Sequence, residues 1–215
     1  MESNTLKKTI YDSLVSDISS GKYAANEILT EGRLMEPFGC SKAPVREALI
    51  ELCKDSFLKS IPRLGYQVVP VSLKEVINIL DFRTDMEVAN LKRAFPRITK
   101  EKLDIFRINE ASWVYENQPN LSIFQNWKKN KSFHLTLCSL SENAFTLQNL
   151  EKLLMQSSRF FPQYYTNAWV NETESKGRFH AQILNALESR DLNEACQLLS
   201  DDIKSVKDQI LLILS

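Results

Sequence analysis

The chain has 215 residues, of which 43% are hydrophobic and 25% charged, and its 27 basic residues balance its 27 acidic ones. This length allows one large domain or two small ones, and the apolar content can form a core without metal or disulfide cross-links. A net charge of zero argues against a protein that binds nucleic acid through bulk electrostatics alone. The four cysteines form no C-x-x-C pair, which is typical of reduced thiols in the cytoplasm.

The chain begins Met-Glu-Ser-Asn-Thr-Leu-Lys-Lys, without the apolar stretch of a secretory signal. No apolar run in the sequence reaches the ~20 residues needed to cross a bilayer. We therefore expect a cytoplasmic protein with no membrane partner.

Glycines divide the chain, because four of the five lie within the first 65 residues. Turns are therefore expected at the front, and long helices in the remainder. Pro70 follows an alternating stretch and marks the boundary. We predict a first domain at residues 1–70 and a second domain at residues 71–215.

Three helices are predicted in the first domain. Apolar residues recur at helical spacing over residues 5–20, and Gly21 is placed to end that helix. A second helix is expected over residues 30–38, with Thr30 as its N-cap, and a third opens at the N-cap residue Ser41. The expected buried face of the third helix comprises Val45, Ala48, Leu49 and Leu52.

Two alternating stretches follow, at residues 57–61 and 66–69, as expected of strands joined by a hairpin tip at residues 62–65. Three short helices and a two-stranded hairpin are typical of a winged helix-turn-helix, a DNA-binding fold. A generic helical bundle with an incidental hairpin is the alternative that this pattern leaves open.

Residues 39–49 read Gly-Cys-Ser-Lys-Ala-Pro-Val-Arg-Glu-Ala-Leu. This string resembles the recognition-helix signature of the GntR superfamily, and residues 62–66 resemble the wing of the same domain. The resemblance covers about residues 6–70 and implies a winged helix-turn-helix that binds double-stranded DNA. The chain departs from the pattern at Lys42, where the family usually has arginine, and at Ala43, where it often has threonine.

Lys42 and Arg46 lie one turn apart near the start of the third helix, the part of a recognition helix that meets base edges. Arg46 is the candidate for base readout, because a guanidinium can donate two hydrogen bonds to one guanine. Further contacts are expected from the second helix, from the start of the third, and from the wing tip in a minor groove. These contacts are assigned to Arg33, Ser41, Ala43, Arg63 and Gly65.

Between residues 33 and 66 the chain has six cations and four anions, only a slight positive excess. We infer that affinity depends on a homodimer that presents two such surfaces to a near-palindromic operator. A winged helix used for protein interaction is the alternative that the small excess supports.

Six further helices are predicted, so the fold class is mainly α: a winged helix-turn-helix followed by an all-helical bundle. They are placed at residues 72–95, 99–117, 121–141, 143–163, 167–189 and 191–213. The chain contains only two histidines, His134 and His180. Each lies in an element that can be compared with a known domain: Asn-x-x-Phe-His at 130–134 and His-x-x-Ile-x-x-Ala at 180–186. Ser-Glu-Asn at 141–143, and Arg83 with Glu87, can be compared with the same domain.

These elements resemble, in order and spacing, the FCD ligand-binding domain of the FadR-type branch of the GntR superfamily. That resemblance implies a divalent-metal site at Asn130, His134, His180 and Asp202. Asn130 stands where the family has Asp, and Asp202 stands where it has a third His, so two imidazoles and one carboxylate remain. Zn, Ni or Mn suits such ligands. The alternative is a metal-free site in which the same groups hydrogen-bond the effector.

Arg83 is expected to bind the carboxylate of a small organic or sugar acid, with Asn130 as a second effector contact. An ion pair between Arg83 and Glu87 is the alternative for that arginine. The predicted function is a ligand-responsive transcription regulator, a repressor and not an enzyme. A metal-dependent hydrolase using His134 and His180 is the rival, although the sequence has no H-E-x-x-H, G-x-S-x-G or phosphate-loop motif.

Overall fold

The computed structural model describes residues 2–111, 123–160, 162 and 173–214. The chain divides into two compact units. The first unit comprises the chain up to Ser72 together with the short 3-10 helix η3 (Ser158–Phe160), and the second begins at Leu73. Residues 158–160, which the sequence placed in the second domain, therefore belong with the first unit.

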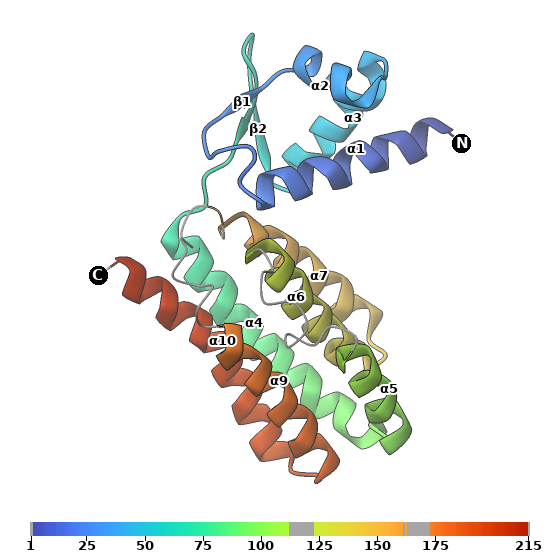
Figure 1. Cartoon of the computed structure of the whole chain (residues 1–215), viewed down its shortest axis with the longest axis vertical. Helices are drawn as coiled ribbons and strands as arrows, with labels where there is room; N and C mark the ends of the chain where they lie inside the picture. Colours follow the sequence, from blue (N-terminus) through green and yellow to red (C-terminus); the bar gives the residue numbers. More distant parts are fainter. Residues whose placement is uncertain (1, 112–122, 161, 163–172, 215) are drawn as a thin grey trace. The chain divides into compact units, whose positions relative to one another are not determined.

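The first unit is a winged helix-turn-helix, as predicted (Figure 1). Its helices are α1 (Glu2–Ser19), α2 (Glu31–Phe38) and α3 (Lys42–Lys54). Its antiparallel sheet has the order β1-β3-β2, formed by β1 (Ile28–Leu29), β2 (Leu58–Ile61) and β3 (Gly65–Val68). The hairpin of β2 and β3 is the predicted wing, whereas β1 was not predicted.

Local signals in the sequence determine where α2 and α3 begin and end. The Thr30 hydroxyl accepts a hydrogen bond from the Arg33 amide at 3.3 Å, and Gly39 ends α2 in the left-handed conformation with φ 54°. Pro44 lies in the first turn of α3, where its missing N–H is not needed. The predicted apolar face of α3 is buried, which leaves its opposite face exposed.

Gly65 opens β3 at a point where only glycine fits. Its φ is +130°, and a Cβ atom there would lie 2.5 Å from the carbonyl oxygen of Leu29 in β1. The missing side chain therefore lets β1 pair with β3, which gives Gly65 a structural role beside the DNA contact expected for it.

The second unit is all-helical, as predicted, and six α-helices lie within its described residues. They are α4 (Leu73–Ala94), α5 (Lys100–Ala111), α6 (Ile123–Ser139), α7 (Ala144–Ser157), α9 (Thr173–Glu188) and α10 (Leu192–Leu214). A 3-10 turn, η1 (Phe95–Arg97), follows α4. In this unit α4 has α10 along one side and α6 and α7 along the other (Figure 1).

Four predicted helices reach residues that the structure does not describe: their parts within 112–122, at 161 and 163, and within 167–172 lie outside the described ranges. The α-helix predicted to reach residue 163 ends at Ser157 and gives way to η3. In the part of the chain that the structure describes, none of the helices is long and apolar enough to cross a membrane.

Replacing Gly65 by alanine should destabilise the protein. The left-handed backbone and the close approach of Leu29 O together predict a loss of about 1–3 kcal/mol in the free energy of unfolding. Urea unfolding followed by circular dichroism measures this loss. Gly32→Ala is the matched control: Gly32 lies in α2, and among the described atoms none lies within 4 Å of its added Cβ, so a gain of about 0.5–1 kcal/mol is expected. Equal effects of the two changes would contradict the strand-contact argument.

Candidate functional site

Four helices of the second unit bring polar side chains to one buried point. Glu87 comes from α4, His134 from α6, His180 from α9 and Asp202 from α10, and all four residues are buried. The structure therefore brings together three of the four residues predicted to bind a metal, places the fourth, Asn130, beside them, and adds Glu87.

His134, His180 and Asp202 have the spacing that a divalent cation needs. The Nε2 atom of His134 lies 3.1 Å from Oδ2 of Asp202, and Nε2 of His180 lies 3.8 Å from the same oxygen. One ligand atom from each residue lies within 4.8 Å of the other two. A cation with bonds of about 2.1 Å holds adjacent ligand atoms about 3.0–3.4 Å apart, so small movements would suffice and the residues fit the ion.

The two imidazole rings are held in fixed orientations. Nδ1 of His134 donates to Oε2 of Glu87 at 2.7 Å, which directs Nε2 toward Asp202. A carboxylate behind a histidine in this way is the usual support of a metal-binding imidazole. The ring of His180 stacks parallel on Phe133, with centroids 3.6 Å apart and an interplanar angle of 4°. Both ligand nitrogens are thereby positioned in advance.

The amide of Asn130 lies beside this cluster, with Nδ2 3.3 Å from Nε2 of His180. Asn126, one turn earlier on α6, is buried, and its Oδ1 has no hydrogen-bond partner among the described residues. Asn126, Asn130 and His134 follow one another at a spacing of four, so they share one face of α6. Asn126 was not among the residues predicted from the sequence, although this spacing could have indicated it.

The buried charges form an alternating chain. Burial opposes the charged form of Glu87, but the charges of Arg83 and His134 hold its pKa below the usual range. Burial also lowers the pKa of His134, yet the Glu87 charge, the close approach of Asp202 and the hydrogen bond to Glu87 raise it overall, to about 9. Without a bound cation His134 is therefore protonated beside Glu87, and a cation bound at its Nε2 atom would displace that proton.

Arg83 makes the ion pair with Glu87 that was the alternative to its effector-binding role. Its Nε donates to Oε1 of Glu87 at 2.8 Å, and both side chains are buried. Its Nη2 atom is also buried and has no hydrogen-bond partner within the described part of the chain. The ion pair therefore leaves part of the guanidinium available to a further acceptor.

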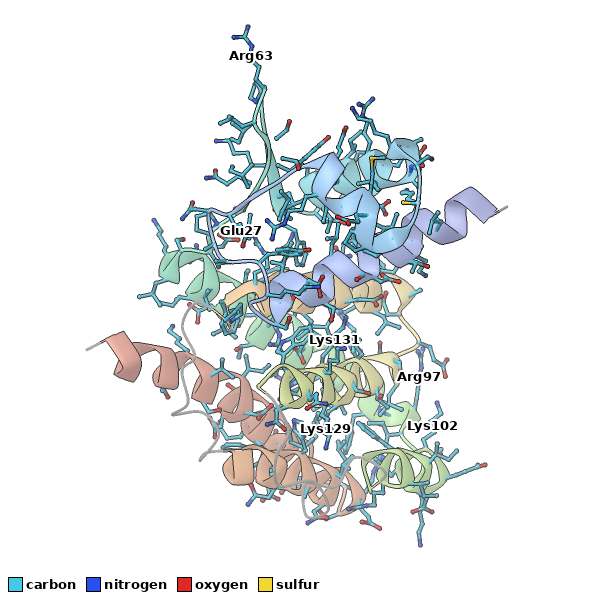
Figure 2. The ribbon with its side chains drawn as sticks, turned by 45° about the horizontal axis from the view of Figure 1, so that its top comes forward. Glu27, Arg63, Arg97, Lys102, Lys129 and Lys131 are labelled. Atoms are coloured by element: carbon cyan, nitrogen blue, oxygen red, sulfur yellow. The ribbon has the colours of Figure 1, made fainter. Side chains whose placement is uncertain are left out.

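In the first unit, the predicted recognition helix is exposed. The side chains of Lys42 and Arg46 are 58% and 53% accessible, and Ala43 between them is exposed as well. Ser41 precedes the helix, and its hydroxyl makes no capping hydrogen bond to the described backbone. Arg63 projects from the tip of the wing (Figure 2). These side chains can be reached by a DNA duplex.

The cations on this face pair with nearby acids. Both Lys42 and Arg46 contact Glu31, the first residue of α2, and Arg33 donates to Glu27 at 2.7 Å. A groove of about 560 Å³, lined in part by Glu31, Lys42 and Arg63, lies between α2, the start of α3 and the wing. Glu31 was not among the functional residues predicted from the sequence.

A winged helix-turn-helix with an exposed recognition helix, in a chain with a second helical unit that holds a buried polar cluster, defines a DNA-binding regulator. Residues 6–68 match the family model of bacterial regulatory proteins of the gntR family, and residues 78–205 match the FCD domain. The chain belongs to the GntR family of transcription regulators, and to its members that carry an FCD domain. The resemblance seen in the sequence is confirmed.

Known proteins similar to this chain are regulators. The Bacillus subtilis regulator YdhC is 29% identical over 143 residues, which span 65% of this chain and 62% of that protein. The Escherichia coli repressor GlaR is 24% identical over 199 residues, 88% of each chain. The solved structure of E. coli McbR/YncC superposes with a TM-score of 0.78 at 18% identity, covering 98% of this chain and 99% of that one, and shows the same fold. The family consists of regulators and not enzymes, which decides against the hydrolase.

Replacing Glu87 by glutamine should strongly destabilise the helical unit. The change leaves the buried charges of Arg83 and His134 without their shared carboxylate, and loss of one partner from a buried pair costs about 3–5 kcal/mol. Asp81→Asn is the control on the same helix, because Asp81 pairs with Lys207 at the surface and its loss should cost about 0–1 kcal/mol. Urea unfolding of both variants tests this, and equal losses would rule out a dominant role for the buried pair.

Proposed function

We propose that this chain is a ligand-responsive repressor that acts in the cytoplasm as a homodimer on a near-palindromic operator. DNA binding is assigned to residues 1–70, with which η3 (Ser158–Phe160) is grouped, and effector binding and dimerisation are assigned to the rest of residues 71–215. Binding of the effector changes the affinity for DNA through a coupling free energy between the two sites. Repression is proposed because the related GlaR is named a repressor.

The exposed start of α3 is the observation that supports DNA binding. Lys42, Ala43 and Arg46 are exposed, while the opposite face of the same helix is buried in the core. Arg46 reads a guanine in the major groove, and Arg63 and Gly65 at the wing contact a minor groove. Ser41 and Arg33 contact phosphates, and the Ser41 hydroxyl can do so because the described backbone does not use it for capping.

The buried cluster is the observation that favours a divalent cation, Zn, Ni or Mn, as part of the effector site. His134, His180 and Asp202 would hold the ion, with Asn130 beside them, and the donor set of two imidazoles and one carboxylate suits these metals. When bound, such an ion supplies a positive centre that attracts the oxygens of an acid. Glu87 orients His134, and Phe133 holds the ring of His180.

Arg83 and the amides of α6 supply the remaining effector contacts. The unpartnered Nη2 of Arg83 and Oδ1 of Asn126 are a buried donor and a buried acceptor without hydrogen bonds in the described part of the chain. Such groups are costly to leave unsatisfied, so a ligand that bonds to them gains affinity. A small organic or sugar acid, which carries a carboxylate and hydroxyl groups, has the matching acceptors and donors.

Arg46→Ala should remove sequence-specific DNA binding. A preferred duplex is first selected from a random library with the wild-type protein, and the Kd is then measured by gel shift at fixed salt. Loss of a bidentate base contact predicts a Kd about 5- to 150-fold higher for the selected duplex and a smaller change for a scrambled one. Arg93→Ala, an exposed arginine of the helical unit, is the control. Unaltered binding by Arg46→Ala would remove α3 from the proposal.

The metal site predicts uptake of one ion per chain. Protein freed of metal with a chelator is titrated with Zn²⁺, Ni²⁺ or Mn²⁺ and followed by calorimetry and by metal analysis after dialysis. His180→Ala should weaken binding by more than the roughly 10- to 100-fold that loss of a supporting group costs. Asn130→Asp should strengthen it, because a carboxylate is a better ligand than an amide. No retained ion in the wild type would favour the metal-free site.

A further inference from the structure

We propose that Glu31 is a specificity-determining positioning residue: its carboxylate holds Arg46 so that the far edge of the guanidinium is presented to a base. This inference rests on the proposed reading of DNA by α3.

The carboxylate binds one particular edge of the guanidinium. Nε of Arg46 donates to Oε1 of Glu31 at 2.7 Å, and Nη2 donates to Oε2 at 3.3 Å. This contact occupies the edge formed by Nε and Nη2. The edge formed by Nη1 and the second hydrogen of Nη2 points away from Glu31, because the guanidinium is planar with its donors in a fixed fork. That free edge has the two parallel donors that the O6 and N7 atoms of guanine accept.

Lys42 is tied to the same carboxylate. Its Nζ lies 2.9 Å from Oε2 of Glu31, the oxygen that also accepts from Nη2 of Arg46. An ammonium has three donors, so this contact leaves two of them for DNA. One carboxylate therefore fixes the relative positions of both cations at the start of α3. The side chains of Lys42 and Arg46 would otherwise lose rotamer freedom when they bind DNA. Because Glu31 already restricts both side chains in the free protein, less conformational entropy is lost on binding.

Glu31 is itself well held. It is the first residue of α2, where the helix dipole stabilises a negative charge, and its side chain is only 15% accessible. The hydrogen bond from Arg46, more than any other interaction, keeps the pKa of its carboxyl below the usual range. A carboxylate that is ionised and anchored in this way serves as a rigid support, whereas Arg46 and Lys42 reach outward from it.

A positioning role and a simple screening role predict different DNA binding. An acid on a DNA-facing surface repels phosphates, so its removal should tighten binding to every duplex when screening is its only effect. When the acid positions Arg46, its removal weakens binding to the preferred duplex relative to others. The ratio of the two affinities separates these cases, and a change in stability alone does not move that ratio.

The experiment uses the full-length protein and the selected duplex. In the wild type, each guanine is replaced in turn by 7-deazaguanine, which lacks the N7 acceptor, and the guanine whose replacement weakens the wild type but not Arg46→Ala is the one that Arg46 reads. Glu31→Ala and Glu31→Gln are then measured on the selected, substituted and scrambled duplexes. Glu36→Gln is the charge-matched control, because Glu36 lies exposed on the same helix and its side chain makes no ion pair among the described residues.

For Glu31→Ala we expect the ratio of scrambled to selected Kd to fall about 5-fold or more, though no further than for Arg46→Ala, and the penalty for 7-deazaguanine to disappear. Glu31→Gln keeps an oxygen for Nε but loses the charge, so its ratio of Kd values should lie between those of the wild type and Glu31→Ala. Glu36→Gln should keep both the wild-type ratio and the wild-type penalty for 7-deazaguanine. Equal tightening on all duplexes, or an unchanged ratio, overturns the positioning role. If Glu31→Ala lowers the melting temperature of the protein, the ratio of Kd values for Glu31→Gln decides whether Glu31 positions Arg46. Failure of Arg46→Ala itself to alter binding would instead reject the reading of DNA by α3.

Discussion

Two carboxylates in the interior of the helical unit, those of Glu87 and Asp202, impose the main constraint on this structure. An ionised carboxylate removed from water is strongly destabilising unless cations and hydrogen bonds surround it. Arg83 and His134 meet that need for Glu87 from two different helices, and Nε2 of His134 also lies 3.1 Å from Asp202. The packing of α4, α6 and α10 is therefore tied to a polar arrangement with a defined geometry, which a purely apolar core would not supply.

The sequence predicted the elements whose signals are local. The N-cap at Thr30 and the apolar face of α3 identified the helix-turn-helix because each signal acts within a few residues of the chain. Strand β1 gave no such signal. It has only two residues, Ile28 and Leu29, and it exists because β3 offers it hydrogen bonds and a glycine that allows close approach. A pairing between distant segments leaves no periodic trace in so short a strand.

The polar sites likewise show that contacts within one helix could be predicted and contacts between helices could not. Arg83 and Glu87 lie four residues apart on one helix, so their contact was foreseen as an alternative. The partner of His134 was not foreseen, because Glu87 is 47 residues away, and neither was the contact of Arg46 with Glu31, 15 residues away. Resemblance placed His134, His180 and Asp202 in one site, but it gave no account of the groups that orient them. Contacts across helices depend on packing, which the spacing of residues does not encode.

The first unit is built from two pieces of chain, since η3 belongs to it. Arg159 is buried there, its Nη1 donates to the carbonyl of Ser56, and its guanidinium lies over the ring of Phe57 at 5.4 Å. Beside it, the hydroxyls of Ser158 and Ser19 are 2.6 Å apart. The first unit, which carries the recognition helix, is thus discontinuous along the polypeptide. A fragment cut once after Ser72 would lack Arg159, which covers Phe57, so no single cleavage yields the intact first unit.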